Sequence, residues 1–172
     1  ASGDLTPMSY IAAALAGERE VYYKGNRVPA KEALASAGIA PYVFKPKEPI
    51  AMINGTPIMT GIAIMAAEKA RRIAEAAMAA TGLSIHAMSG NAHHYNQSIS
   101  DAKPYPGQDR VARTIRWYLS TDIDQSEFEK RALETLQDPY SRRCSPQIVG
   151  VLLDALAWIR TWIETEANSA ND

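Results

Sequence analysis

Two long segments without proline in their interiors most constrain how this chain can fold. Thr56-Pro57 opens one of them, which continues to about Ala80, and Ser145-Pro146 opens the other, which continues to about Ala167. Ser and Thr suit the cap of a helix, and proline suits its first turn, where no hydrogen bond is lost. Apolar residues in the second segment alternate at steps of three and four, as in a bundle seam: Val149, Leu152, Leu156, Ile159 and Ile163. Both segments are therefore predicted to be long packed helices.

Shorter elements are expected between and around these two segments. The remaining predicted helices span residues 8–16, 31–37, 108–120 and 125–136. Residues 21–23 and 27–28 flank Lys24-Gly25-Asn26 and predict a small hairpin. Residues 39–49 hold three prolines and are expected to be extended, whereas residues 83–100 fit no single element. The fold class predicted is all-α, a bundle of long helices with a small β-hairpin.

Composition narrows the function classes. The 172 residues are 47% hydrophobic and 22% charged with a net charge of −1, which indicates one globular domain without a basic nucleic-acid surface. Charge or glycine interrupts the apolar stretches before the length of a membrane span, so no transmembrane helix is expected. The one cysteine, Cys144, excludes an internal disulfide and fits the cytoplasm.

Five other side chains are expected to have structural roles. His93 and His94 are adjacent, and neither they nor His86 have an acid or cysteine at ligand spacing, so no metal site is expected. Trp158 and Trp162 stand one helical turn apart and are interpreted as a packing pair.

Three polar stretches each precede a predicted helix start: residues 1–5, Asn54-Gly55 and residues 137–144. A helix N-terminus carries unpaired N–H groups and a partial positive charge. If the three ends gather in one place, they would stabilise a developing negative charge. Alternatively, they are three ordinary capped helices that never meet, and the pattern alone leaves both readings open.

The first three residues allow an unusual covalent chemistry. The Gly3 nitrogen can attack the carbonyl carbon of Ala1, and loss of two waters, one with the Ser2 hydroxyl, would leave an exocyclic methylene on an imidazolone ring. Gly3 offers an unhindered nitrogen, Ala1 is small, and Ser2 supplies the leaving group. The product is a strong electrophile, although Ala, Ser and Gly are common residues.

Five collinear motifs resemble the aromatic amino acid ammonia-lyase and aminomutase family, which includes histidine, phenylalanine and tyrosine ammonia-lyases. Residues 1–7 resemble its prosthetic-group signature, residues 47–56 resemble "KEGLALINGT", and residues 103–108 resemble "RPHPGQ" with Tyr105 in place of histidine. Residues 137–147 resemble "QDPYSLRCQPQ", and residues 166–172 resemble "EANSATD". The match spans the chain, so residues 1–172 are interpreted as a segment of the enzyme core of a longer protein.

The resemblance implies the following site. Ala1, Ser2 and Gly3 would form the 4-methylideneimidazole-5-one (MIO) ring, with no metal. The other catalytic residues would be Asp4, which assists ring formation, and Tyr140, which lies near the ring. Substrate would be bound by Asn54, by Gln137 and by Arg143, whose planar guanidinium suits a carboxylate. The enzyme would be a homotetramer whose sites draw on several subunits.

The activity implied is elimination of ammonia from an aromatic L-amino acid to give an arylacrylate such as cinnamate or coumarate, or a 2,3-aminomutase reaction. Residues 59–63 favour phenylalanine or tyrosine over histidine, which would give urocanate. The family's catalytic lid tyrosine precedes the Ala-Ser-Gly motif, and further site residues follow the last motif, so this segment alone is not expected to be competent. The alternative from another class is a non-catalytic helical scaffold in which residues 1–3 form an ordinary turn. The partners expected are the amino acid and other copies of the chain, without nucleic acid or membrane.

Overall fold

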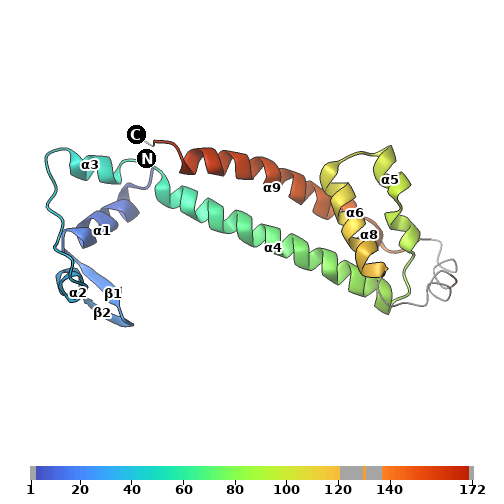
Figure 1. Cartoon of the computed structure of the whole chain (residues 1–172), viewed down its shortest axis with the longest axis horizontal. Helices are drawn as coiled ribbons and strands as arrows, with labels where there is room; N and C mark the ends of the chain where they lie inside the picture. The colour runs from blue at the N-terminus through green and yellow to red at the C-terminus, as the bar shows by residue number, and fades with distance from the viewer. Residues whose placement is uncertain (1–2, 121–129, 131–136, 171–172) are drawn as a thin grey trace. The chain divides into compact units, whose positions relative to one another are not determined.

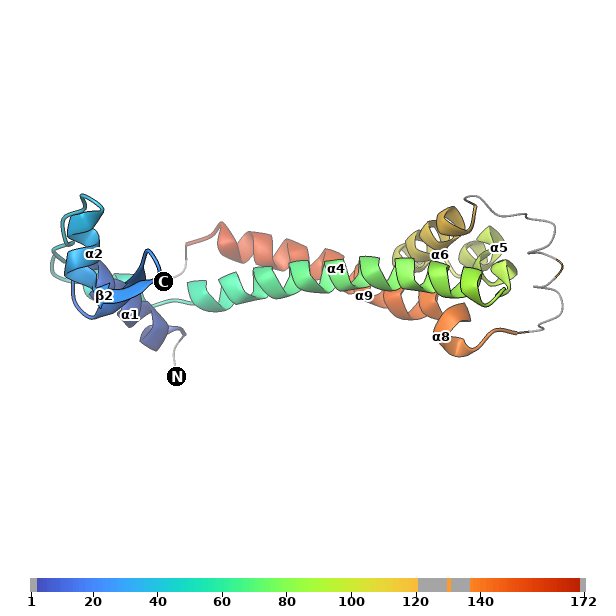
Figure 2. The same cartoon turned by 90° about the horizontal axis from the view of Figure 1, so that it is seen from below.

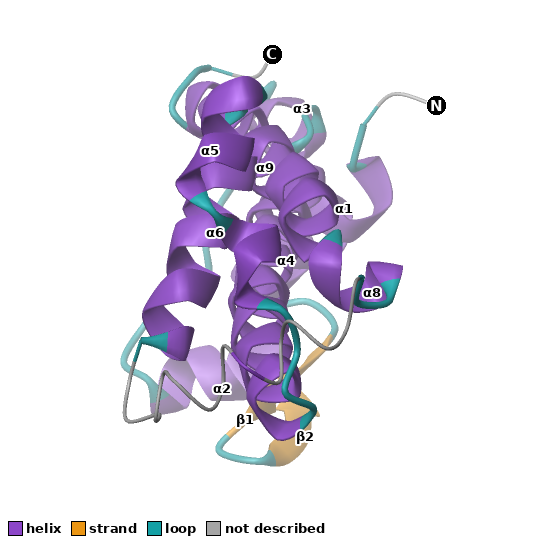
Figure 3. Cartoon of the chain, turned by 90° about the vertical axis from the view of Figure 1, so that its right-hand side faces the viewer, coloured by secondary structure: helices purple, strands orange, loops and turns teal. Residues whose placement is uncertain are grey.

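The fold of this chain is helical with one small hairpin (Figures 1 and 3). A computed structural model describes residues 3–120, 130 and 137–170. They form two compact units, one of residues 1–64 with 163–172 and the other of residues 65–162. The predicted all-α class with a hairpin is confirmed. The predicted helix at 125–136 lies outside the described residues, apart from Lys130, which is helical.

The first unit holds the hairpin and three short helices: α1 (Leu5–Leu15), β1 (Glu20–Tyr23), β2 (Asn26–Pro29), α2 (Ala30–Ser36) and α3 (Glu48–Ile53). The strands are antiparallel, with Val21 opposite Val28. Lys24 and Gly25 both have positive φ, of 50° and 82°, as a tight two-residue hairpin turn requires. The extended segment that the sequence predicts through Pro49 ends earlier, because Pro49 lies in the first turn of α3.

Helices α4 (Pro57–Ala87) and α9 (Ser145–Ala167) are the two long elements predicted from their Thr-Pro and Ser-Pro starts (Figure 2). The sequence-based end of α4 near Gly82 is wrong, because the helix continues to Ala87. A Cβ built on Gly82 would lie 2.9 Å from the Cβ of Tyr118. The glycine therefore permits the close approach of a neighbouring helix rather than ending its own.

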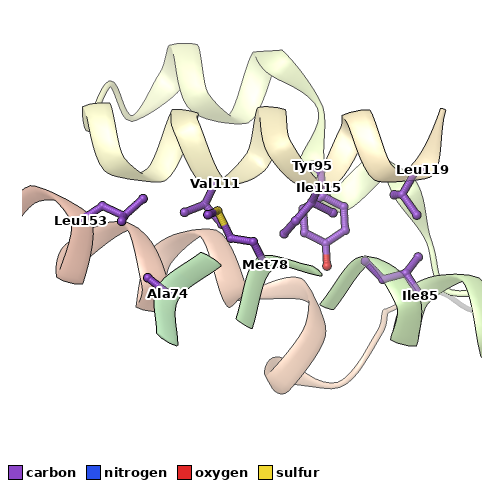
Figure 4. Close-up of a cluster of buried hydrophobic side chains, with 8 residues drawn as sticks. All are labelled: Ala74, Met78, Ile85, Tyr95, Val111, Ile115, Leu119 and Leu153. Atoms are coloured by element: carbon purple, nitrogen blue, oxygen red, sulfur yellow. The ribbon is translucent and has the colours of Figure 1, made fainter. Parts of the chain in front are cut away.

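The second unit has the main hydrophobic core (Figure 4). Besides the long helices it contains η1 (Ala92–Tyr95), α5 (Gln97–Ala102), α6 (Pro106–Leu119) and α8 (Tyr140–Arg143). The cluster comprises residues of α4, η1, α6 and α9: Ala74, Met78, Ile85, Tyr95, Val111, Ile115, Leu119 and Leu153. Val149 and Leu152 of the predicted seam pack against it. Tyr95 is 1% exposed and joins this core to the turn that precedes α9.

The expectation that charge or glycine interrupts every apolar stretch before the length of a membrane span does not hold. An 18-residue window within Glu48–Ala87 has a mean hydropathy of 1.6 and is 6% buried, so by length and composition this helix could cross a membrane. Gly61 does not interrupt it, since the helix continues through this residue. The same test is passed by core helices of soluble bundles, so the window is weak evidence for a membrane span.

Candidate functional site

The backbone at Gly3 packs directly against the loop between α3 and α4. Gly3 has a φ of 66°, a conformation that L side chains rarely adopt. A Cβ built on it would lie 2.3 Å from the Gly55 carbonyl oxygen. The next residue, Asp4, donates its N–H to this same oxygen at 2.8 Å. Glycine is thus required at position 3 for the chain to lie against Asn54-Gly55.

The Asp4 carboxylate connects the start of α1 with the start of α4. Its Oδ2 accepts the N–H of Met59 in the first turn of α4 at 2.8 Å, whereas α1 has no side-chain cap from it. Thr56, which the sequence suggests as the cap of α4, donates its hydroxyl to Glu166 Oε1 at 3.2 Å. A carboxylate at a helix N-terminus pairs an orphan N–H and complements the partial positive charge there.

Asn54 is the residue that ends α3 and leads into this loop. Its N–H donates to the Ile50 carbonyl at 2.9 Å, and its backbone then turns to an extended conformation, with φ −90° and ψ 104°. The residue is half-buried and lies three positions before Pro57, where α4 begins. The structure therefore brings together Gly3, Asp4 and the Asn54 loop, while Ala1 and Ser2 lie outside the described residues.

The second group of predicted site residues lies on and just before α8. Gln137 is exposed, and Tyr140 is 70% exposed. The Arg143 guanidinium carbon lies 4.1 Å from the centre of the Tyr140 ring, a cation–π arrangement that holds both side chains in one place. Arg143 Nε is buried and has no hydrogen-bond partner among the residues that the structure describes. Arg143 thus retains donor capacity for an anionic group.

Four residues that contact this group or one another were not predicted as site residues from the sequence: Asn91, His94, Tyr95 and Asp138. The Asp138 side chain is 1% exposed. Its Oδ2 accepts the Asn91 N–H at 2.8 Å, and its own N–H donates to His94 Nε2 at 3.2 Å. The one feature of the sequence that could have pointed to any of these four residues was the position of Asp138 inside the "QDPYS" motif.

Burial controls the protonation of two of these groups. Burial lowers the pKa of His94, and the charges of Arg143 and His93 act in the same direction, while Asp138 opposes them. Burial also raises the pKa of the Tyr95 hydroxyl above its usual range. His94 therefore tends to the neutral form, which accepting the Asp138 N–H at Nε2 requires.

The two groups of site residues belong to different units of the chain. Asp4 and Asn54 lie in the first, and Gln137, Tyr140 and Arg143 lie in the second. Of the three helix starts that the sequence singled out, those of α1 and α4 are joined through Asp4, and that of α9 belongs to the second unit. The open question of whether all three ends meet is thus answered for two of them.

A ring formed from residues 1–3 would be built on a closely packed stretch of backbone. Gly3 lies against the Gly55 carbonyl, and Asp4 is fixed beside it. Within the described part of the chain, no group of three or more His, Cys, Asp or Glu side chains could hold a metal ion. Cys144 is a free, half-buried thiol next to the buried Ser145.

Comparison with known proteins agrees with the five motifs. The sequence model of a family described as aromatic amino acid lyase matches residues 1–172. The probable histidine ammonia-lyase of Thermoplasma volcanium is 38% identical over 174 residues, which cover 100% of this chain and 34% of that protein.

Solved structures agree as well. The phenylalanine aminomutase of Pantoea agglomerans superimposes with a TM-score of 0.88 at 33% identity, covering 100% of this chain and 36% of that one. For the histidine ammonia-lyase of Trypanosoma cruzi the TM-score is 0.84 at 30% identity, covering 99% and 31%. This chain thus spans about a third of the length of its relatives, and it belongs to the aromatic amino acid lyase family.

Proposed function

We propose that the full-length protein eliminates ammonia from an aromatic L-amino acid to give an arylacrylate, or shifts the amine to the β-carbon as an aminomutase. The observation that carries this proposal is the packing of Gly3 and Asp4 against the Asn54-Gly55 loop. The Gly55 carbonyl leaves no room for a side chain at position 3 and accepts the Asp4 N–H. Residues 1–3 would form the MIO ring, which supplies an electrophile that no unmodified side chain provides.

Each of the other residues has a role that its geometry supports. Asp4, held by the Met59 N–H, fixes the backbone on which the ring would be built. Asn54, at the end of α3, would offer its amide to the substrate. Arg143 would bind the substrate carboxylate in a bidentate pair, with Tyr140 stacked on its guanidinium and Gln137 nearby in the chain. In the proposed homotetramer, each active site draws on several subunits, and the cytoplasm is the proposed location.

Phenylalanine and tyrosine are the proposed substrates, and histidine is the second candidate. The first choice is supported by residues 59–63 and by structural similarity to phenylalanine and tyrosine aminomutases, with TM-scores of 0.88 and 0.87. The second is supported by curated relatives named histidine ammonia-lyase, such as that of Geobacillus thermodenitrificans at 40% identity. Aminomutases and histidine ammonia-lyases both share the fold of this chain. Fold similarity therefore does not select the substrate, and a direct assay is needed.

The test uses the full-length protein and two readouts. Mass measurement of the peptide carrying residues 1–3 should show the loss of two waters. Ultraviolet absorbance with phenylalanine, tyrosine and histidine in parallel should show cinnamate, coumarate or urocanate. A ring without any of these products would favour an aminomutase or another amino acid, and absence of both ring and product would favour the non-catalytic scaffold.

Ser2→Ala is the decisive variant, because it removes the hydroxyl that the ring needs while the fold is retained. We expect it to keep both waters in the peptide and to abolish turnover. The matched control is Ser9→Ala, which removes the Ser9 hydroxyl that donates to the Thr6 carbonyl at 2.7 Å on the same helix. Wild-type turnover in Ser2→Ala would contradict the assignment.

A further inference from the structure

The four-residue helix α8 is held on its buried side by a pair of opposite charges. Arg142 Nη2 lies 3.6 Å from Asp138 Oδ1, and the two side chains are 12% and 1% exposed. Arg142 Nη1 is buried without a hydrogen-bond partner among the described residues. Asp138 is therefore the carboxylate that compensates the Arg142 charge, and a buried charge without such a partner is strongly unfavourable.

The backbone of α8 is held by Tyr95, also at Arg142. Its hydroxyl donates to the Arg142 carbonyl at 2.7 Å, while its ring is 1% exposed in the core of the second unit. The Tyr95 carbonyl in turn accepts from the Arg116 guanidinium of α6. A residue fixed in the core thus determines where the backbone of Arg142 lies.

Along this stretch, the residues that make these inward contacts alternate with the residues that would bind substrate. Asp138 and Arg142 contact the interior, whereas Tyr140 and Arg143 stack on each other and Tyr140 is exposed. Arg143 N–H donates to the Pro139 carbonyl at 3.1 Å, as the Arg142 N–H does at 3.0 Å, so the two arginines share one turn. Moving Arg142 would therefore move Arg143.

We propose that Asp138, Arg142 and Tyr95 are positioning residues that hold α8 so that Arg143 and Tyr140 meet the substrate carboxylate in one fixed place. The charge pair between Arg142 and Asp138 and the hydrogen bond from Tyr95 both act on Arg142, the residue next to Arg143. The substrate-related part rests on the proposed function, whereas the holding of α8 does not.

The first test is Asp138→Asn in the full-length enzyme. The amide can still accept the Asn91 N–H, but it leaves Arg142 without a compensating charge. Displacing a positioned group by about 1 Å can lower the reaction rate by about a hundredfold. We expect kcat/KM to fall by about tenfold to a hundredfold. Because Arg143 would bind the substrate carboxylate, a higher KM should account for most of this fall, with a smaller change in kcat. Glu75→Gln is the control, because it removes a carboxylate from an exposed ion pair with Arg71.

The second readout is amide hydrogen exchange, followed by mass, of the peptide that covers α8. We expect faster exchange across residues 140–144 in Asp138→Asn and in Tyr95→Phe, which keeps the ring and removes only the hydroxyl. Exchange elsewhere and the mass of the ring-bearing peptide should stay as in the wild type. In an Arg142→Leu background, Asp138→Asn should change KM and the exchange at residues 140–144 much less, because no buried charge is then left unpaired.

The outcomes separate this inference from the proposed function. Unchanged KM and unchanged exchange at 140–144, or simple additivity of Asp138→Asn and Arg142→Leu, would overturn the inference. Faster exchange throughout the protein would assign these residues to general stability and would also overturn it. If the wild type has neither ring nor turnover, the proposed function fails, and the substrate-related part fails with it. Exchange at 140–144 would still decide whether these residues hold α8.

Discussion

At the scale of single residues, Gly3 combines a positive φ with a lack of space for any side chain. We expect Gly3→Ala to prevent the chain from docking on the Asn54-Gly55 loop, because the added Cβ would lie 2.3 Å from the Gly55 oxygen at a φ of 66°. Ring formation should therefore fail, and the peptide carrying residues 1–3 should keep both waters in its mass. Normal ring formation in Gly3→Ala would show that this packing is not needed.

The lowered pKa of His94 leads us to expect that the stability of the fold depends on pH. Burial lowers its pKa, with Arg143 and His93 acting in the same direction and Asp138 opposing them. The stability that neutral His94 contributes is therefore present above its ordinary pKa of about 6.5, and it is lost as the pH falls through the lower pKa of the folded state. Protonation would also remove the acceptor for the Asp138 N–H.

His94→Gln is the variant that tests this dependence, because its amide oxygen can accept a hydrogen bond but does not titrate. The unfolding temperature of the full-length wild type should fall more steeply than that of His94→Gln between about pH 7.5 and pH 5.5, the range around the histidine pKa. Parallel curves would contradict the sign of the shift.

The sequence points to candidate site residues inside local motifs, and it offers no signal for residues defined by distant contacts. Gly3 and Asp4 lie against the Asn54-Gly55 loop, and their roles in a site stay predictions. Asp138 and Tyr95 each bond to a residue 47 positions away, at Asn91 and Arg142 respectively. No local pattern signals such a pairing, so these roles required the structure.

At the scale of elements, glycine marks the contact between α6 and α9. A Cβ on Gly107 would lie 2.1 Å from the Gly150 carbonyl oxygen, and one on Gly150 would lie 2.5 Å from the Gln108 nitrogen. The Gly107 N–H also donates to Asp154 Oδ1 at 2.8 Å. The two helices can therefore approach this closely only because neither position carries a side chain.

We expect Gly150→Ala to destabilise the full-length protein by about 1–3 kcal/mol, the usual effect of overpacking. Gly61→Ala is the matched change, since no atom of the described residues lies within 4 Å of a Cβ at Gly61 in α4. It should stabilise by about 0.4–1 kcal/mol through the unfolded chain. Denaturant unfolding of both variants measures the difference, and equal midpoints would show that the α6–α9 contact tolerates a methyl group.

The elements with strong start signals and long periodic patterns were the ones that the sequence predicted. Helices α4 and α9 begin at Pro57 and Ser145, where the Thr-Pro and Ser-Pro pairs placed them. The short helices α3 and α8 were missed, because six and four residues offer too little periodicity. The end of α4 was misplaced for another reason, since Gly82 serves a tertiary contact that its neighbours in sequence do not reveal.

At the scale of the whole molecule, apolar side chains remain exposed along one side of α9. Ile148, Val151, Trp158 and Trp162 are between 64% and 70% exposed, with spacings that place them on one face of the helix. Trp158 and Trp162, which the sequence suggests as a packing pair, are both exposed within this chain. Sequence periodicity shows that a face is apolar but not what covers it, and this chain is about a third of its relatives.

In the proposed homotetramer, another subunit would pack against this apolar face of α9. We expect Trp158→Glu in the full-length protein to reduce the assembly to smaller species, because a buried charge at an apolar subunit contact is unfavourable. Light scattering during size-exclusion chromatography measures the mass directly. Ala157→Glu is the control, since it adds the same charge at an exposed neighbouring position outside this apolar face. A tetramer that persists in Trp158→Glu would mean that the face is not a subunit contact, and it would leave the rest of the same chain as the cover for α9.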